Sequence, residues 1–356
     1  MDPAALRILD AEFNRAREGL RVLEEHARFV LDDSALTQRL KALRHDLVAL
    51  EPRLAGRPAL GWRDTRHDVG TTASVPTEIH RGTPVDVAAA AARRLGESLR
   101  CIEEYGKLID AGAAEAVEAL RYRLYIIEQD MLLTAPRRMR LAQARMYVLI
   151  TASLCRHDWY RTAEGVLEGG ADVIQLREKD LADGELLCRA LRLRELTERH
   201  AALLVINDRP HIARLAKADG VHVGQGDLSV ADARQIAGPT LLVGKSTHST
   251  REIREAVLEE PDYIAVGTMF ASPTKPDVRV QGPGLLAEAA RMTHLPLVAI
   301  GGITEANVAR LETSRRVAIA VCQAVIGAED PAVAARKLRA AATCSPATAQ
   351  TAEAGS

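Results

Sequence analysis

The chain has 356 residues, and its 47 Lys and Arg residues balance 48 Asp and Glu residues to a formal charge of −1. This length, with 47% hydrophobic residues, predicts two domains with substantial cores and excludes disorder of the whole chain. The balanced charge, the 3% aromatic content and the lack of an apolar run of about 20 residues argue against nucleic-acid binding and against membrane insertion.

The cellular location is expected to be the cytoplasm. The segment 1–7 carries charged residues where a signal peptide would be apolar. The five cysteines are odd in number and form no CxxC pair, which favours reduced thiols over a disulfide or zinc framework. The sequence leaves the formation of a homo-oligomer open.

Residues 1–138 predict an all-α domain with an internal repeat. Apolar residues recur at helical spacing, and the sequence EGLRVLEE at 18–25 returns as ESLRCIEE at 97–104. The same offset aligns Arg44 with Arg123. The repeat predicts two helical hairpins that pack as four helices, with residues 52–84 joining them. The segment Pro136-Arg137-Arg138 is taken as the domain boundary.

The charged residues of this repeat allow two interpretations. Glu18 and Arg21, like Glu97 and Arg100, are three residues apart on one helix face. A solvent-exposed series of ion pairs is favoured, and a pair of Arg-rich walls that binds an anionic ligand is the alternative. The charged segment 62–70 is either a lid over a ligand or a polar surface loop.

Residues 139–342 predict a (β/α)8 TIM barrel, because eight short β-rich runs alternate with amphipathic stretches. A doubly wound sheet is the alternative, and residues 343–356 predict a disordered tail. The predicted strands are 146–151, 173–176, 203–206, 220–223, 241–244, 263–266, 296–300 and 316–321.

Polar residues follow these strands at the end where barrel enzymes carry their active sites. Asp208 and Asp227 follow neighbouring strands, and two carboxylates without a Cys/His cluster suit Mg²⁺ better than zinc. The alternative for Asp208 is an N-cap of the next helix. Lys245, Ser246 and Thr247 are expected in the loop after the fifth strand.

The other polar residues indicate two phosphate sites. Arg177, Lys179 and Lys275, with the hydroxyls of Ser246 and Thr274, predict a site for a pyrophosphate leaving group. Gly301 and Gly302 can present backbone amides to a second phosphate, or serve tight-turn geometry alone. His222 and His248 are candidate acid/base groups, although a structural role is favoured for both.

From residue 147 to about residue 328 the chain resembles thiamin phosphate synthase. The motifs that carry this resemblance are 175-QLREK-179, 206-INDR-209, 220-GVHVGQGD-227, 244-GKSTH-248, 274-TKP-276 and 299-AIGGI-303. The resemblance implies a transferase that joins 4-amino-5-hydroxymethyl-2-methylpyrimidine diphosphate to hydroxyethylthiazole phosphate, or its carboxylate. The products are thiamin monophosphate and pyrophosphate, Mg²⁺ is the cofactor, and the substitution is dissociative.

The resemblance also implies a role for each site residue. Gln175 contacts the aminopyrimidine, Asp208 and Asp227 hold Mg²⁺, and the diphosphate contacts are Arg177, Lys179, Asn207, Ser246 and Lys275. Of these, Arg177, Lys179, Ser246 and Lys275 are catalytic because they stabilise the leaving group. The remaining substrate contacts, at the thiazole phosphate, are Ser272, Thr274, Gly301, Gly302, Cys322 and Gln323. Ser272 keeps a hydroxyl where the family often has Thr, whereas Gln323 replaces a frequent Ser, so the contact expected at position 323 is that of the backbone.

Two other functions remain as alternatives for the barrel: a thiazole tautomerase, which needs no diphosphate site, and a non-catalytic protein that binds a phosphate ligand. The helical half resembles the N-terminal domain fused to some bacterial thiamin phosphate synthases, through 14-NRAREGLR-21 and its second copy. That resemblance implies binding or channelling of pyrimidine phosphates, or a role in assembly.

Overall fold

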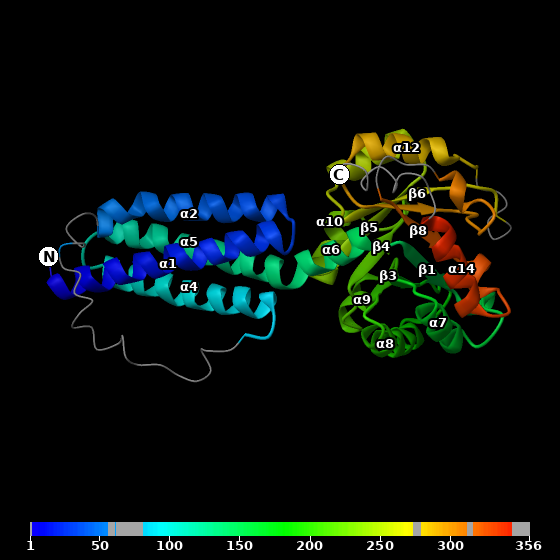
Figure 1. Ribbon diagram of the computed structural model, residues 1–356, viewed down its shortest axis with the longest axis horizontal. Coiled ribbons are helices and arrows are strands. Elements are labelled where there is room, and N and C mark those ends of the chain that lie inside the picture. Colours follow the sequence, from blue (N-terminus) through cyan, green and yellow to red (C-terminus); the bar gives the residue numbers. More distant parts are fainter. Residues whose placement is uncertain (1, 56–60, 62–80, 273–278, 312–315, 344–356) are drawn as a thin grey trace, which may run out of the picture. The chain divides into compact units, whose positions relative to one another are not determined.

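The computed structural model describes residues 2–55, 61, 81–272, 279–311 and 316–343, and the chain divides into two compact units, Met1–Pro136 and Arg137–Ser356. The first unit is helical and the second contains a closed barrel (Figure 1). The charged segment 62–70 lies outside the described residues. So does the expected tail, apart from Thr343, which is the last residue of a helix.

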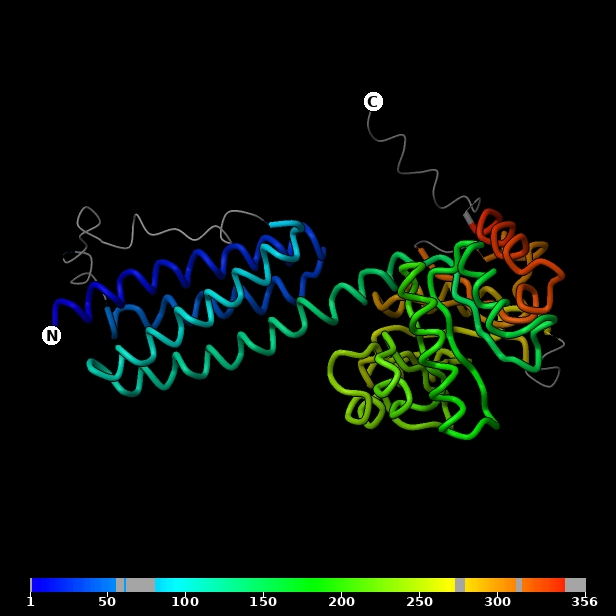
Figure 2. Tube along the Cα trace, turned by 90° about the horizontal axis from the view of Figure 1, so that it is seen from below, coloured from blue at the N-terminus to red at the C-terminus, as the bar shows by residue number. Residues whose placement is uncertain are grey.

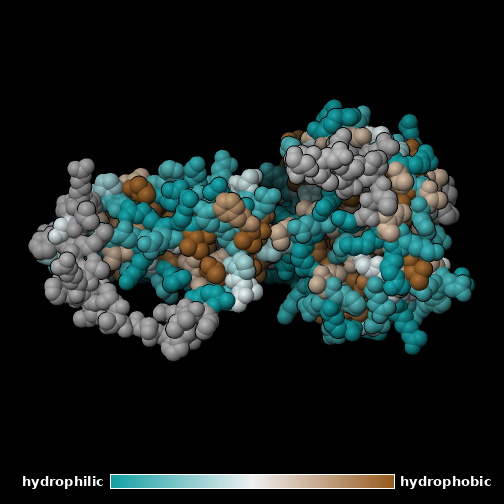
Figure 3. All heavy atoms as spheres, viewed as in Figure 1, coloured by the Kyte–Doolittle hydropathy of each residue, from teal (hydrophilic) through white to brown (hydrophobic). Residues whose placement is uncertain are grey.

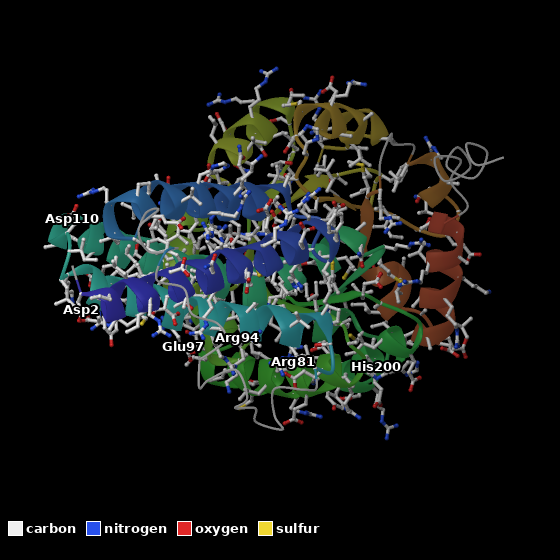
Figure 4. All side chains as sticks on the ribbon, turned by 60° about the vertical axis from the view of Figure 1, so that its left-hand side comes forward. Asp2, Arg81, Arg94, Glu97, Asp110 and His200 are labelled. Atoms are coloured by element: carbon white, nitrogen blue, oxygen red, sulfur yellow. The ribbon has the colours of Figure 1, made fainter. Side chains whose placement is uncertain are left out.

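The helical unit is a bundle of four long helices. They are α1 (Pro3–Phe29), α2 (Ser34–Leu54), α4 (Pro84–Gly106) and α5 (Ala111–Gln129). Each begins at a residue whose side chain accepts a hydrogen bond from a backbone N–H of the first turn, which satisfies an otherwise unpaired donor. Two of these residues, Asp2 and Asp110, lie at the same end of the bundle (Figure 4).

The predicted pairing of helical hairpins is confirmed, since α1 packs against α2 and α4, and α5 against α2 and α4. Glu24 of α1 accepts a hydrogen bond from Arg44 Nε at 3.1 Å, and Glu103 of α4 accepts one from Arg121 Nε at 3.1 Å. The counterpart of Arg44 is therefore Arg121 and not Arg123. Two residues turn a helix by about 200°, so Arg123 leaves the buried face and pairs with Asp46 at 2.6 Å.

The favoured ion-pair interpretation also describes the two repeated arginines. Arg21 pairs with Glu25 at 2.8 Å, and Arg100 pairs with Glu104 at 2.8 Å. Both partners lie four residues after the arginine. Among the described residues the arginines therefore pair with these glutamates, and not with Glu18 and Glu97, which lie three residues before them.

The expected boundary at Pro136 is helical. Helical residues continue from α5 through the π-helical turn η2 (Asp130–Thr134) into α6 (Ala135–Gln143) without interruption (Figure 2). Proline lacks the N–H of a regular helix, and its ring collides with the carbonyl four residues earlier. The wider turn just before Pro136 accommodates this restriction without ending the helix.

The second unit is a closed barrel of eight parallel strands in the order β1 to β8, which confirms the predicted TIM barrel and excludes the doubly wound sheet. The strands are β1 (Met146–Ile150), β2 (Val173–Leu176), β3 (Leu203–Asn207), β4 (Gly220–Val223), β5 (Leu242–Thr247), β6 (Tyr263–Gly267), β7 (Leu297–Ile300) and β8 (Ala318–Val321).

Helices cover the outside of this barrel. The α-helices are α7 (Trp159–Glu168), α8 (Asp183–Arg199), α9 (Pro210–Leu215), α10 (Val230–Ala237), α11 (Thr250–Leu258), α12 (Pro283–Met292), α13 (Gln323–Ile326) and α14 (Pro331–Thr343), with 3-10 turns η3 (Ala152–Leu154) and η4 (Val308–Arg310).

Strand residues alternate between two cores. One set, including Val148 and Ile174, packs outward against the helices, and the other, including Leu149 and Val205, fills the barrel. Strand β5 extends to Thr247. The prediction that Lys245, Ser246 and Thr247 lie in the following loop is therefore wrong, because all three belong to the strand. The alternation turns Lys245 outward, where its Nζ lies 3.5 Å from Glu259.

Aspartates close the amino-terminal end of the barrel. Asp219, just before β4, accepts hydrogen bonds from the Leu204 N–H at 2.9 Å and from the guanidinium groups of Arg194 at 2.7 Å and Arg137 at 3.2 Å. Asp172 before β2 and Asp262 before β6 bind a backbone N–H and arginines in the same way. Arg137 and Arg138 both come from α6, and Leu141 of this helix packs with the barrel interior.

The visible surface of the barrel is mostly hydrophilic, while hydrophobic residues stand among hydrophilic ones on the visible face of the helical unit (Figure 3). Within the part of the chain that the structure describes, none of the helices has the length and apolar content to cross a membrane.

Candidate active site

A cavity of about 500 Å³ opens at the carboxyl ends of the barrel strands. Every predicted site residue that the structure describes contributes to its lining. These residues are Gln175, Arg177, Lys179, Asn207, Asp208, Asp227, Ser246, Ser272, Gly301, Gly302, Cys322 and Gln323. Thr274 and Lys275 lie outside the described residues, so their placement stays a prediction.

Two carboxylates face each other at this opening. Asp208 follows β3 and Asp227 follows β4, as expected from the sequence. Burial, together with the hydrogen bond and negative charge of Asp227, raises the pKa of Asp208 to about 6. The basic side chains of Lys179 and Arg177 oppose this rise, and the Lys179 Nζ lies 3.9 Å from the Asp208 carboxylate. A cation bound between these two close carboxylates would stabilise their charged forms.

The backbone at Asp208 is folded into a strained turn. Asp208 has a φ of 61°, and the Arg209 N–H donates to the Asn207 carbonyl at 2.8 Å across it, as in a γ-turn. The Asp208 N–H donates to the His222 carbonyl of β4 at 2.8 Å. The neighbouring strand thus holds Asp208 in a conformation that a non-glycine residue rarely adopts. Asp208 caps no helix here, because Arg209 is the residue that precedes α9.

Asp227 is fixed by its own loop. Its carboxylate accepts a hydrogen bond from the Gly224 N–H at 2.8 Å, and Gln225 of the same loop donates to the Ser246 carbonyl at 2.6 Å. Glu178, between Arg177 and Lys179, accepts from the Ala152 N–H at 2.8 Å and from Arg189 at 2.9 Å. Glu178 therefore holds the preceding loop and does not face the cavity.

A chain of buried hydrogen bonds crosses the floor of the cavity. Gln175 Nε2 donates to the Tyr147 hydroxyl at 2.8 Å, and the Tyr147 and Tyr263 hydroxyls are 3.0 Å apart. The Tyr263 hydroxyl lies 3.1 Å from His222 Nδ1, and His222 Nε2 lies 2.8 Å from Ser246 Oγ. The two tyrosines were not singled out from the sequence. The sequence feature that could have identified them is a tyrosine at an inward-facing strand position, where the other inward-facing residues are mostly aliphatic.

The two candidate histidines differ in environment. Burial lowers the pKa of His222 to about 4, so its imidazole is neutral at pH 7. His248 pairs with Glu252 at 3.1 Å on α11. Both line the cavity, and both are held by side chains of the protein. This agrees with the structural role favoured for them from the sequence.

Tight glycine geometry shapes the opposite side of the cavity. Gly301 and Gly302 have φ values of 105° and 62°, and a Cβ on Gly302 would lie 2.4 Å from the Ala271 carbonyl oxygen. Asn307 donates to the Gly302 carbonyl at 2.8 Å and fixes the turn. Cys322 and Gln323 stand at the start of α13, and burial raises the pKa of the Cys322 thiol, which keeps it from acting as a thiolate.

The donor set is compatible with Mg²⁺. The described residues contain no group of three or more His, Cys, Asp or Glu side chains that could enclose a metal ion. Magnesium commonly binds through one or two carboxylates together with water and substrate phosphates, so Asp208 and Asp227 suit it if the substrate supplies further oxygens.

Comparison with known proteins gives matches over both units. Residues 146–325 match the family described as thiamine monophosphate synthase, and residues 7–130 match the ThiD2 family. A thiamine-phosphate synthase of Thermosynechococcus vestitus is 42% identical over 335 residues, which cover 93% of this chain and 93% of the relative. One from Gloeobacter violaceus is 40% identical over 330 residues, with coverages of 93% and 94%.

A solved structure supports the barrel assignment. The thiamine phosphate pyrophosphorylase from Pyrococcus furiosus is 33% identical and superposes with a TM-score of 0.53, covering 57% of this chain and 97% of its own.

Proposed function

Because this chain belongs to the thiamine-phosphate synthase family and is a transferase that makes thiamin phosphate, we propose how its cavity divides between two substrates. The pyrimidine diphosphate binds beside the ends of β2 to β5, and the thiazole phosphate binds beside the ends of β6 to β8. The observation that carries this division is the lining of the cavity. On one side Asp208 and Asp227 lie close to the basic side chains of Lys179 and Arg177. On the other side lies the Gly301-Gly302 turn.

The leaving group explains the chemistry of the first side. Arg177, Lys179, Asn207 and Ser246 line the cavity here and offer the charges and donors that a diphosphate needs as its bond to carbon breaks. Lys275 joins them in this proposal. Asp208 and Asp227 would hold Mg²⁺, which supplies charge neutralisation to the departing diphosphate when it is bound.

The second side positions the nucleophile. The amides of Gly301 and Gly302, the backbone at Cys322 and Gln323, and the hydroxyls of Ser272 and Thr274 would hold the thiazole phosphate. The thiazole nitrogen already has a free lone pair, so the reaction needs no strong general base. A neutral, hydrogen-bonded His222 and a paired His248 fit that requirement. Catalysis then consists of leaving-group stabilisation and positioning.

An assay of the full chain tests this proposal. With both substrates, thiamin phosphate and pyrophosphate should form in equal amounts, and a chelator should abolish both until Mg²⁺ is restored. Product formation that is unaffected by the removal of divalent cations would contradict the assignment of Asp208 and Asp227.

For the helical unit we propose a role with pyrimidine phosphates. A surface groove between α4 and α5 places Arg93 and Arg100 beside the rings of Tyr105 and Tyr125. The glutamates Glu97, Glu104 and Glu128 line the same groove, so the two guanidinium groups are the part of it that could contact an anion. Arg100 is held by Glu103 and Glu104, so an anionic ligand has to compete with these carboxylates. If Arg21→Ala/Arg100→Ala binds pyrimidine phosphate and turns over like the wild type, this proposal is wrong, and assembly becomes the remaining role.

A further inference from the structure

The buried chain from Gln175 to Ser246 links the two ends of the proposed pyrimidine diphosphate site. Four hydrogen bonds join five side chains from β2, β1, β6, β4 and β5 in that order. Gln175, Tyr147, Tyr263 and His222 are all buried. Ser246 is partly exposed and lines the cavity.

The orientation of the Gln175 amide sets the direction of the hydrogen bonds in this chain. Gln175 donates one proton to Tyr147, each tyrosine has one hydroxyl proton, and neutral His222 has one N–H. If Tyr147 donates to Tyr263, Tyr263 to His222 Nδ1, and His222 Nε2–H to Ser246, every bond has one proton. The Ser246 hydroxyl proton is then free to point into the cavity.

The opposite direction requires the Gln175 side-chain amide to be rotated. If Ser246 donates to His222 Nε2, the protons run back through Tyr263 to Tyr147. The Tyr147 hydroxyl proton then has an acceptor only when the Gln175 amide is rotated, so that its Oε1 faces Tyr147. With the amide as the structure has it, reversal would leave a buried hydroxyl without an acceptor, which is costly. The orientation of the amide and that of the serine hydroxyl are therefore tied together.

Ionisation offers no escape from this coupling. Burial raises the pKa values of Tyr147 and Tyr263, so at pH 7 both hydroxyls stay protonated, and each ring nitrogen of His222 contacts a hydroxyl rather than a carboxylate. The rings are also held in place: the Tyr263 and His222 ring centroids are 5.5 Å apart with planes at 30°. The chain can reverse as a whole but cannot break at one member cheaply.

We propose that Tyr147, Tyr263 and His222 are positioning residues that transmit hydrogen-bond polarity between Gln175 and Ser246. The site then selects a ligand with a hydrogen-bond donor at the Gln175 end and an anionic acceptor at the Ser246 end. This inference rests on the proposed function, in which Gln175 contacts the pyrimidine and Ser246 contacts the diphosphate.

The amino group of the pyrimidine satisfies the first condition, because it donates to Gln175 Oε1 and keeps the Gln175 Nε2 on Tyr147. The Ser246 hydroxyl proton then points to the diphosphate, as the second condition requires. A 4-oxo pyrimidine presents an acceptor instead, which turns the amide, reverses the chain and removes the Ser246 proton from the diphosphate. Discrimination against the oxo compound therefore arises at both ends of the site.

The first test reads His222 directly. The full chain with nitrogen-labelled histidine is studied by NMR, the His222 signal is assigned with His222→Gln, and saturating pyrimidine alcohols without phosphate are added. These ligands have no phosphate to contact Ser246. The 4-amino alcohol should give the Nε2–H tautomer and the 4-oxo alcohol the Nδ1–H tautomer. In Tyr147→Phe, which keeps both direct partners of His222, the two alcohols should give the same tautomer. A single tautomer with both alcohols in the wild-type protein would overturn the proposal.

The second test is kinetic and compares the kcat/KM values of the 4-amino and 4-oxo diphosphates. Their intrinsic difference in reactivity is the same for every variant and cancels between variants. Tyr263→Phe and Tyr147→Phe should each reduce the preference for the amino compound by tenfold or more. Thr247→Val removes a buried hydroxyl of β5 that takes no part in the hydrogen-bond chain from Gln175 to Ser246. This variant should leave the preference for the amino compound unchanged. Equal losses for both substrates in the tyrosine variants would mean a merely structural role. Failure of the wild-type chain to form thiamin phosphate would instead contradict the proposed function.

Discussion

A Cβ atom on Gly244 would lie 2.1 Å from Cζ of Tyr263, so the tyrosine ring occupies the space that any other residue at position 244 would need. Gly244 and Tyr263 are register partners on β5 and β6. The absence of a side chain on one strand thus sets the position of the hydroxyl in the middle of the buried chain.

Gly244→Ala should displace this ring and lower the free energy of unfolding of the barrel by about 1–3 kcal/mol, as overpacked cores do. It should also lower kcat, because Tyr263 loses its partners. Denaturant unfolding and steady-state kinetics measure the two effects. Gly184→Ala in α8, where a Cβ meets nothing within 4 Å, is the control and should not destabilise the barrel. A Gly244→Ala protein as stable and active as the control would contradict the packing argument.

Magnesium binding should weaken in acid, since metal ligands must be deprotonated. The pKa of Asp208 is raised to about 6, so Asp208 holds a proton below that pH and releases it above. From pH 7 to pH 5 the apparent affinity for Mg²⁺ with inorganic diphosphate should fall by about tenfold from this group alone. Asp227→Asn removes the neighbouring negative charge and should move the dependence to lower pH. Titration calorimetry at several pH values decides, and an unchanged pH dependence in Asp227→Asn would contradict this explanation.

The barrel should lose stability in acid through His222. Burial lowers its pKa to about 4 in the folded chain, against about 6.5 when unfolded, so the unfolded state takes up a proton first. The stabilisation is complete above pH 6.5 and is lost as pH falls toward 4, amounting to about 3 kcal/mol. Urea unfolding, followed by Trp159 fluorescence in a Trp62→Phe background, should show a smaller loss of unfolding free energy between pH 7 and pH 4.5 in His222→Gln. Identical losses would place the neutral imidazole in doubt.

The arginines of α6 should contribute to barrel stability. Arg137→Ala removes a guanidinium from the buried Asp219 and a hydrogen bond to the Thr240 carbonyl, and should cost about 1–3 kcal/mol. Arg251→Ala breaks only an exposed pair with Glu255 and should cost less than about 0.5 kcal/mol. Comparison of the two variants by thermal unfolding tests this, and equal melting temperatures would show that α6 does not brace the barrel.

Leaving-group stabilisation predicts large effects on turnover with the fold kept. Asp208→Ala and Lys275→Ala should each lower kcat by roughly a hundredfold or more, the range seen when one donor to a developing charge is lost. Circular dichroism confirms the fold, and pyrophosphate release gives kcat. Turnover at the wild-type rate in either variant would remove that residue from the proposed site.

The sequence was sufficient for the barrel because each strand is a short, apolar run between turn residues, and all eight were placed within a few residues. The sequence predicts too early an end for β5, because a lysine ordinarily indicates a loop. Lys245 is buried and pairs with the partly exposed Glu259, and pairing between distant residues of this kind leaves no local pattern.

The cavity lining was predictable because polar residues at strand ends have few other uses in this fold. The buried chain was not, because a tyrosine in a strand ordinarily indicates packing. Only the register that brings Tyr147, Tyr263 and His222 to the same interior reveals their hydroxyl and ring nitrogen contacts. The helical repeat is evident from the sequence, but the residue that matches Arg44 is not. A constant offset aligns Arg44 with Arg123, which is also an arginine, whereas the buried helix face carries Arg121.

The bonds of Arg137 and Arg138 to Asp219 and Asp262 also limit where the polypeptide could be divided between its two units. A break after residue 138, where composition changes, would leave these two arginines on the wrong polypeptide. A break that preserves the barrel has to fall upstream of Arg137, inside an uninterrupted helix, where no loop offers a tolerant site for insertion. Dividing the polypeptide at this junction should therefore destabilise the barrel, whatever the helical unit does.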